Sequence, residues 1–175
     1  MTDSTFPDCF TLGRELMRSM DRETRHMHGA EYTPRAYVER LIAQVLAPVL
    51  EEWELTERYV AALECTYRGE ARARALELVE DFHRRLCAYT VLDPAAGSGN
   101  ILVVALEAFA DLELAAAVWL LWLGASAESL ARGIELSQFK GIEIDPRTHL
   151  ACRVSVRLAW LRSRMRRDAL KVAIS

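Results

Sequence analysis

The segment 91–102, VLDPAAGSGNIL, limits the possible folds more than any other part of this sequence. The β-branched and apolar run 89–93 predicts a buried strand, residues 94–99 predict a glycine-containing turn, and a helix should cover about 100–110. In open parallel sheets, ligands bind at the carboxyl ends of the strands, where Asp93 stands. Its carboxylate can accept a hydrogen bond from a ligand ammonium, and the N–H groups of the turn can hold a carboxylate. An ordinary turn without a ligand is the alternative, and the full Asp-Pro-x-x-Gly-Ser-Gly string favours a nucleotide-type site over it.

A second strand is predicted at 139–144 (FKGIEI), and Asp145 and Pro146 then suit the N-cap and the first position of a helix. The order strand, helix, strand, helix predicts a parallel α/β unit. Glu143 ends this strand, where a carboxylate can accept both ribose hydroxyls of a nucleoside, and Ile144 can cover the adenine face. A surface acid is the alternative for Glu143 taken alone, and the order of the two motifs favours the ribose role.

Helical periodicity dominates the first half of the chain. Thr33 suits an N-cap and Pro34 the first helical position of a helix over about 34–47, and Pro48 marks its expected end. The uncharged stretch 114–127 is too short to span a bilayer. It either packs fully inside a helical domain or lacks part of its cover. Three further helices are predicted from the same periodicity, over 51–68, 70–86 and 112–123.

Composition narrows the class of protein. The 175 residues carry a formal net charge of −3, which gives no global sign of a nucleic-acid partner. The N-terminus lacks a positive start followed by an apolar run, so no signal peptide is predicted. Cys9, Cys65, Cys87 and Cys152 are scattered, with no Cys-x-x-Cys pair and no histidine at ligand spacing. They predict reduced, buried thiols, no metal site and a cytoplasmic protein.

A dinucleotide-binding fold is the rival interpretation of the glycine turn. It requires a third glycine three residues after the second, where this sequence has Leu102. It also requires an acidic residue about 20 residues further on. The next strand ends at Glu143, much further along the chain. Both departures count against a nicotinamide cofactor.

Three segments together resemble successive motifs of class I S-adenosylmethionine-dependent DNA adenine methyltransferases. They are HGAEYTPRAYVERLIAQVL, VLDPAAGSGNILVVALEAF and SQFKGIEIDPRTHLACRVSVRLAW. More narrowly, they resemble the methylase module of fused restriction–modification enzymes and of phage-defence methylases. The similarity covers about 27–160, and the middle segment is the most specific. It implies S-adenosylmethionine as the cofactor and the adenine amino group as the methyl acceptor.

Carried over residue by residue, the resemblance implies a cofactor site with three parts. The Tyr-Thr-Pro segment would lie against the methionine end, the turn would bind that end, and the second strand would hold the ribose and adenine. A helix cap is the alternative for the Tyr-Thr-Pro segment. Ala96 and Ile101 depart from the family, which has cysteine and phenylalanine there. The implied cofactor-binding residues are Tyr32, Thr33, Pro34, Asp93, Pro94, Ala95, Gly97, Gly99, Asn100, Glu143, Ile144 and Asp145.

The family grips its flipped adenine with an Asn/Asp/Ser-Pro-Pro-Tyr/Phe motif after a later strand. No Pro-Pro pair occurs in this sequence. The resemblance therefore implies an N-terminal fragment of the enzyme without catalytic residues of its own. DNA would be bound through the complete enzyme, with a second chain as a further partner that supplies the catalytic and target-recognition parts. The alternative is a non-catalytic remnant or partner-binding subunit that keeps the nucleotide-binding fold.

The expected fold class is α/β, with a helical N-terminal region followed by the first strand-helix-strand-helix part of a truncated Rossmann-like methyltransferase sheet. The expected organisation is a polar N-terminal segment (1–30), a helical region with the Tyr-Thr-Pro motif (31–87) and a partial Rossmann-like cofactor-binding domain (88–175).

The last predicted helix is rich in cations. They suit either phosphate contact or a solvated helix face, and these two interpretations remain open. The cations are Arg147, Arg153, Arg157, Arg162, Arg164, Arg166, Arg167 and Lys171.

Overall fold

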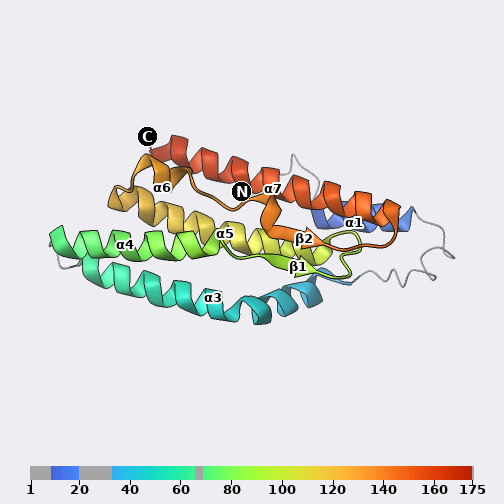
Figure 1. Cartoon of the computed structure of the whole chain (residues 1–175), viewed down its shortest axis with the longest axis horizontal. Coiled ribbons are helices and arrows are strands. Elements are labelled where there is room, and N and C mark those ends of the chain that lie inside the picture. The colour runs from blue at the N-terminus through green and yellow to red at the C-terminus, as the bar shows by residue number, and fades with distance from the viewer. Residues whose placement is uncertain (1–8, 20–32, 66–68, 175) are drawn as a thin grey trace.

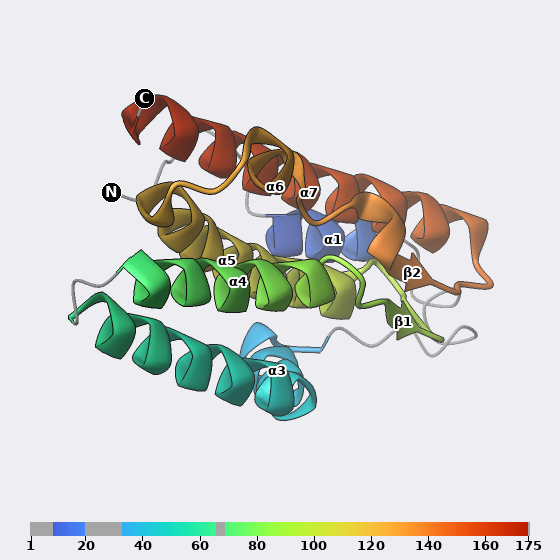
Figure 2. The same cartoon turned by 60° about the vertical axis from the view of Figure 1, so that its left-hand side comes forward.

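A computed structural model describes residues 9–19, 33–65 and 69–174. Its long helices lie side by side, and its two short strands lie together beside the first half of α7 (Figure 1). Both views place α3 and α7 on opposite sides with α5 between them (Figures 1 and 2). The elements are α1 (Cys9–Arg18), α3 (Arg35–Glu64), α4 (Gly69–Leu86), β1 (Val91–Asp93), α5 (Asn100–Leu123), α6 (Ala127–Ala131), the 3-10 helix η1 (Leu136–Gln138), β2 (Phe139–Gly141) and α7 (Pro146–Ile174).

The sheet consists of β1 and β2, which pair in parallel with Asp93 opposite Gly141. Both predicted strands exist but are shorter than expected, and hydrogen bonds beyond their ends continue the pairing from β2 to the turn after β1. The Ile142 N–H donates to the Asp93 carbonyl at 2.9 Å, and the Ala96 N–H donates to the Ile142 carbonyl at 2.9 Å. A mostly helical chain with a small parallel sheet agrees with part of the α/β methyltransferase fold that the resemblance implies.

The prediction that Pro48 ends a helix is wrong, because α3 runs without interruption from Arg35 to Glu64. A proline inside a helix removes one backbone hydrogen bond. Here Pro48 lies on the exposed side, while the buried face continues past it on both sides. The start of α3 also differs: Pro34 occupies the N-cap position, and no side chain caps the helix. The buried face consists of Val38, Ile42, Leu46, Val49, Trp53 and Val60.

Two helices predicted over 100–110 and 112–123 form a single helix, α5, which ends at Gly124 with a φ of 78°. Asp111 does not interrupt it, because the side chain points outward and pairs with Arg166 at 2.9 Å. The apolar second half is largely covered, with Ala116, Ala117, Leu120 and Leu123 all buried. Trp122 remains 65% exposed, and its indole N–H donates to Glu64 at 3.1 Å. Packing among the helices covers most of this stretch, but Val118 and Trp122 stay exposed, so it does not pack fully and lacks part of its cover.

The hydrophobic core is shared by α1, α3, α4, α5 and α7, with α5 in contact with each of the others.

The four cysteines are free thiols, as expected. Cys9 and Cys152 are buried and Cys87 is partly buried. The expectation of burial is wrong for Cys65, because it follows the last residue of α3 at the surface. Among the described helices, none combines the length and apolar character needed to cross a bilayer.

An ion pair inside the protein joins α5 to α7. Arg167 and Glu113 have side chains that are only 3% exposed, and the Arg167 Nη1 to Glu113 Oε1 distance is 2.8 Å. Arg167 also donates to the carbonyls of Leu130, at 2.7 Å, and of Arg132. Gly133 fits beside it only because it lacks a side chain, since a Cβ there would lie 1.8 Å from Arg167 Nη1. The connection between α6 and β2 is thereby tied to the two central helices.

His83 is a buried titratable group on α4, 2% exposed. Its Nε2 lies 3.7 Å from the Sγ of Cys87, one turn further along the helix. Burial, with smaller contributions from the positive charges of Arg167 and Arg132, lowers the pKa of His83 to about 4. Burial likewise raises the pKa of the Cys87 thiol to about 12. Both side chains are therefore neutral near pH 7.

Candidate functional site

The turn after β1 is held by hydrogen bonds within itself and to β2. Asp93 Oδ1 accepts from the Ala95 N–H at 3.0 Å, and the Gly99 N–H donates to the Ala96 carbonyl at 2.8 Å. Gly97 and Gly99 have φ angles of 54° and 90°, a region that side chains other than glycine rarely adopt. The two glycines of the sequence motif are therefore required by the backbone of the turn.

Gly99 is also required by packing, because it faces α7 closely. A Cβ at Gly99 would lie 3.1 Å from the Sγ of Cys152 and 3.1 Å from the Cγ2 of Val156. Gly141, in β2, is similarly close to the turn, since a Cβ there would lie 2.8 Å from that of Ala96. The turn, β2 and α7 thus meet where only glycines allow the approach.

Replacing Gly99 with alanine should lower the free energy of unfolding by about 3 kcal/mol, from a strained φ and from crowding against Cys152 and Val156. Gly97 is the matched control, because its φ is also positive but a Cβ there would have nothing within 4 Å. Gly97→Ala should cost about 1 kcal/mol. Urea denaturation of both variants measures the difference. Equal losses would show that the contact with α7 contributes nothing.

Glu143 connects the two motifs directly. It follows β2 by two residues, and its Oε2 accepts from the Gly97 N–H at 2.9 Å. Its Oε1 accepts from the Asp145 N–H at 2.9 Å. Each carboxylate oxygen keeps a second acceptor position. The structure therefore brings the predicted ribose-binding acid onto the predicted glycine turn, although the two are far apart in the sequence.

Asp93 has one carboxylate oxygen that nothing in the described structure satisfies. The residue is 6% exposed, and its Oδ2 is buried without a hydrogen-bond donor. A buried acceptor without a donor costs free energy, and such exceptions to the usual pairing call for an explanation. A cationic or N–H-bearing ligand group beside this oxygen would supply the missing donor.

The N–H groups of the turn are only partly available to a ligand. Those of Ala95, Ala96, Gly97 and Gly99 all donate to acceptors of the protein itself. An α-helix leaves its first N–H groups without partners inside the helix, and α5 begins directly after the turn, at Asn100. An anion would therefore be held mainly by the start of α5 and less by the turn than the motif predicts.

The segment after Glu143 combines a fixed cap with an exposed apolar side chain. Asp145 is buried, and its Oδ2 accepts from the Thr148 N–H at 3.1 Å and from the Thr148 hydroxyl at 2.5 Å. This confirms the prediction that Asp145 and Pro146 begin the helix. Ile144 is 85% exposed. An apolar side chain is thus available beside Glu143, where the sequence placed a cover for adenine.

The Tyr-Thr-Pro segment is only partly described. Tyr32 lies outside the described residues, and Thr33 and Pro34 are exposed just before α3. Arg35, the next residue, bonds through Nη2 to the Glu107 carboxylate of α5 at 2.6 Å. Within the described part of the chain, no hydrogen bond joins Thr33 or Pro34 to the glycine turn. The segment is fixed to the side of α5, and its expected contact with a methionine group stays a prediction.

A cavity of about 330 Å³ adjoins this site between β2, η1 and α7. Glu143 and Cys152 both form part of its wall. Burial, together with the nearby charges of Asp93 and Glu143, raises the pKa of the Cys152 thiol to about 11. No sequence pattern predicted this cavity or the place of Cys152 in its wall. The cavity forms only because α7 packs close to β2 and the turn.

Comparison with known proteins identifies the family of the chain. A family model described as "MmeI, DNA-methyltransferase domain" matches residues 68–173, which is more than half of the sequence and includes the turn, both strands and all but the last residue of α7. No curated protein and no solved structure matches the chain. The match and the resemblance of the motifs agree on a methyltransferase of a restriction–modification type. This chain belongs to the MmeI DNA-methyltransferase domain family.

Proposed function

We propose that this chain binds S-adenosylmethionine and is the cofactor-holding part of a site-specific DNA adenine methyltransferase in a restriction–modification or phage-defence system. The observation that carries the proposal is the meeting of Asp93, Gly97 and Glu143 at the carboxyl ends of two parallel strands. Rossmann-like folds bind nucleotides at this edge. The family match supports methyl transfer to DNA as the overall reaction.

The residues present fit the proposed cofactor. The buried Asp93 Oδ2 lacks a donor, and the α-ammonium of a methionine group would supply one. The first turn of α5 would hold the α-carboxylate of the same group. Glu143 has acceptor positions left for the ribose hydroxyls, and Ile144 offers an apolar face to the adenine. When bound, the cofactor supplies a methyl group on a sulfonium, and these residues hold and orient it.

In this proposal, residues outside this sequence position the target base for methyl transfer. An enzyme that methylates a base in duplex DNA takes the base out of the stack and grips it on its hydrogen-bonding edge. We assign that grip to a partner chain with a Pro-Pro-type motif, since this sequence has no Pro-Pro pair. Thr33 and Pro34, and Tyr32 before them, would lie against the methionine end of the cofactor.

Titration calorimetry with S-adenosylmethionine tests the proposal. Saturable binding is expected, and Asp93→Asn should weaken it at least tenfold, because an amide retains the bond to Ala95 but loses the charge that holds the ammonium; tenfold corresponds to about 1.4 kcal/mol. Glu143→Gln should weaken it as well. The matched control is Asp111→Asn, which removes an exposed carboxylate of α5. It should leave the affinity unchanged.

Two outcomes would count against this function. Absence of heat with folded protein would show that the chain does not form the cofactor site by itself. Tighter binding of a nicotinamide dinucleotide than of S-adenosylmethionine would favour a different nucleotide-binding protein on the same fold. Methyl transfer to DNA by the 175-residue chain alone would retain the cofactor assignment and overturn the assignment of the grip to a partner.

A further inference from the structure

Charge is distributed very unevenly between α7 and the rest of the chain. Residues 146–174 contain eight arginines and lysines and one acid, a formal charge of +7. The remaining residues contain 14 basic and 24 acidic side chains, a formal charge of −10, and the two sum to the net charge of −3. An acidic partner would therefore be attracted to α7 and repelled by most of the remaining surface.

Half of the cations of α7 form contacts with other side chains of the protein. Arg167 is buried with Glu113, Arg166 pairs with Asp111, and Arg164 lies 3.7 Å from Glu135 and over the ring of Trp160. Arg162 contacts the sulfur of Cys9. By contrast, the side chains of three exposed arginines form no hydrogen bond or ion pair within the described residues. They are Arg147, Arg153 and Arg157.

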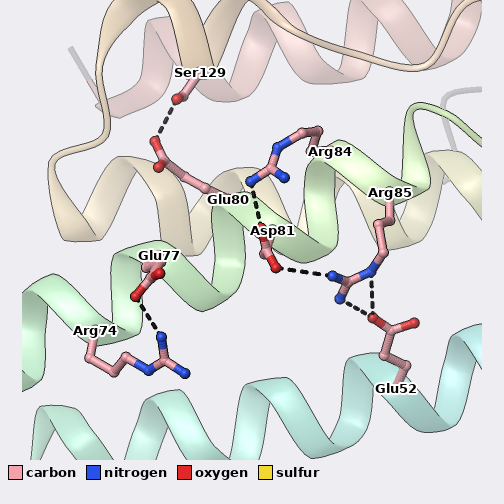
Figure 3. A network of polar contacts seen from close by, with 8 residues as sticks. All are labelled: Glu52, Arg74, Glu77, Glu80, Asp81, Arg84, Arg85 and Ser129. Carbon is pink, nitrogen blue, oxygen red and sulfur yellow. Dashed lines mark hydrogen bonds and ion pairs between the residues drawn. The ribbon is translucent and has the colours of Figure 1, made fainter.

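The exposed arginines of α4 differ from these three, because they are paired with acids. Figure 3 shows Arg74 paired with Glu77, Arg84 with Asp81, and Arg85 with both Asp81 and Glu52. These contacts lower the pKa of Asp81, mainly through the hydrogen bond from Arg84. The charged face of α4 is therefore neutralised by its own neighbours.

An exposed apolar row runs along α7, with Arg157 within it and Arg153 beside it. Its members stand at positions 150, 154, 161 and 165, which share one face of a helix with about 3.6 residues per turn. Leu150 is 59% exposed, Val154 41%, Leu161 44% and Met165 57%. We call these four residues, together with Arg153 and Arg157, the α7 ridge.

The α7 ridge opens into the cavity of about 330 Å³ beside β2. Leu150, Val154, Arg153 and Arg157 all contribute to the wall of this cavity, and its inner wall includes Phe139. A partner that covered the ridge could therefore insert one large apolar side chain between α7 and β2. A buried apolar anchor with charged residues around it is the usual anatomy of a strong protein contact.

We propose that the α7 ridge docks an acidic amphipathic helix of a partner protein. Apolar residues of that helix would cover Leu150, Val154, Leu161 and Met165, and its carboxylates would pair with Arg153 and Arg157. Helices bind apolar grooves in this way through anchors at i, i+4 and i+7 spacing. Duplex DNA fits less well, because its phosphates would meet the arginines but leave the apolar row without a partner.

The test uses two labelled synthetic peptides of about 21 residues, both with leucine at the a and d positions of three heptads. One carries glutamate at e and g, and the other carries lysine. Fluorescence anisotropy with the full chain should show saturable binding of the acidic peptide and none of the basic one. Raising the salt from about 50 to 200 mM should weaken the binding.

Variants separate the two parts of the ridge. Arg153→Glu/Arg157→Glu and Val154→Asp should each weaken binding of the acidic peptide at least tenfold. The matched controls are on α3, the helix on the opposite side from α7 (Figure 1): Arg40→Glu/Arg58→Glu reverses two exposed charges, and Leu55→Asp alters a side chain that is 66% exposed. Both controls should bind as the unaltered chain does.

Three results would overturn the proposal. Equal binding of both peptides would show apolar adhesion without charge selection. Tighter binding of a duplex of about 20 base pairs, lost in Arg153→Glu/Arg157→Glu but kept in Val154→Asp, would make the ridge a phosphate contact. Self-association of the chain, abolished by the same variants, would make a second copy the occupant. The peptide comparison on the unaltered chain decides the question even where a variant fails to fold.

Discussion

Replacing Arg167 with methionine is expected to lower the free energy of unfolding by about 3–5 kcal/mol. The change keeps an apolar stem in place but leaves the Glu113 carboxylate buried without its countercharge. It also removes the donor to the Leu130 and Arg132 carbonyls, which hold the segment before β2. Urea denaturation followed by circular dichroism measures the loss.

Two further variants test whether the unpaired buried charge causes this loss of stability. Arg166→Met removes the neighbouring cation, whose pair with Asp111 is exposed, and should cost less than about 1 kcal/mol. Arg167→Met/Glu113→Leu removes both buried charges and should recover part of the lost stability, because no uncompensated charge remains. If the double variant is less stable than the single one, Glu113 stabilises the fold through more than its pairing with Arg167, such as the hydrogen bond that it accepts from the Ile134 N–H at 3.3 Å.

Acidification should destabilise the protein through His83 before most carboxylates titrate. The pKa of His83 is about 4 in the folded chain against an ordinary value of 6.5, so the unfolded chain binds more protons between these values. The contribution is fully present above pH 6.5 and is lost as the pH falls towards 4. A gap of this size corresponds to about 3 kcal/mol at pH 4.

Unfolding free energies measured at intervals from pH 7 to pH 5 isolate this contribution. His83→Leu removes the titrating group while keeping an apolar side chain in the core, and its stability should depend much less on pH over this window. His149→Gln, at the exposed start of α7, should keep the dependence of the unaltered chain. A slope that survives in His83→Leu would assign the acid sensitivity to other groups.

Short-range patterns predicted the parts of the fold that local chemistry determines. The glycine turn, the two strands and the Asp145 cap depend on residues a few positions apart, and the structure contains all of them. Pro48 misled the prediction because its local cost is outweighed by a buried face that continues along α3 on both sides. The same happened at Asp111, which periodicity treated as a boundary and which lies on the outer face of α5.

Long-range pairings could not be predicted from the sequence. Spacing placed Glu143 at a strand end and Gly97 in a turn, but only the parallel register of β1 and β2 brings the carboxylate onto the Gly97 N–H. Nothing local indicates that Glu113, among many acids, is the one that enters the core with Arg167. The unsatisfied Oδ2 of Asp93 likewise appears only when every neighbouring donor has been placed.

The bond between Glu143 and the glycine turn has a consequence for how the chain acquires its site. In the sequence, Gly97 and Glu143 are separated by all of α5 and the connection to β2. Their hydrogen bond is therefore a long-range contact that forms only when this part of the chain has folded. The unfolded chain therefore cannot hold a ligand there. A ligand that binds would stabilise the whole fold, by about 2.7 kcal/mol at a hundredfold excess over its Kd. A melting temperature that rises with ligand concentration would thus report assembly of the site without any measurement of catalysis.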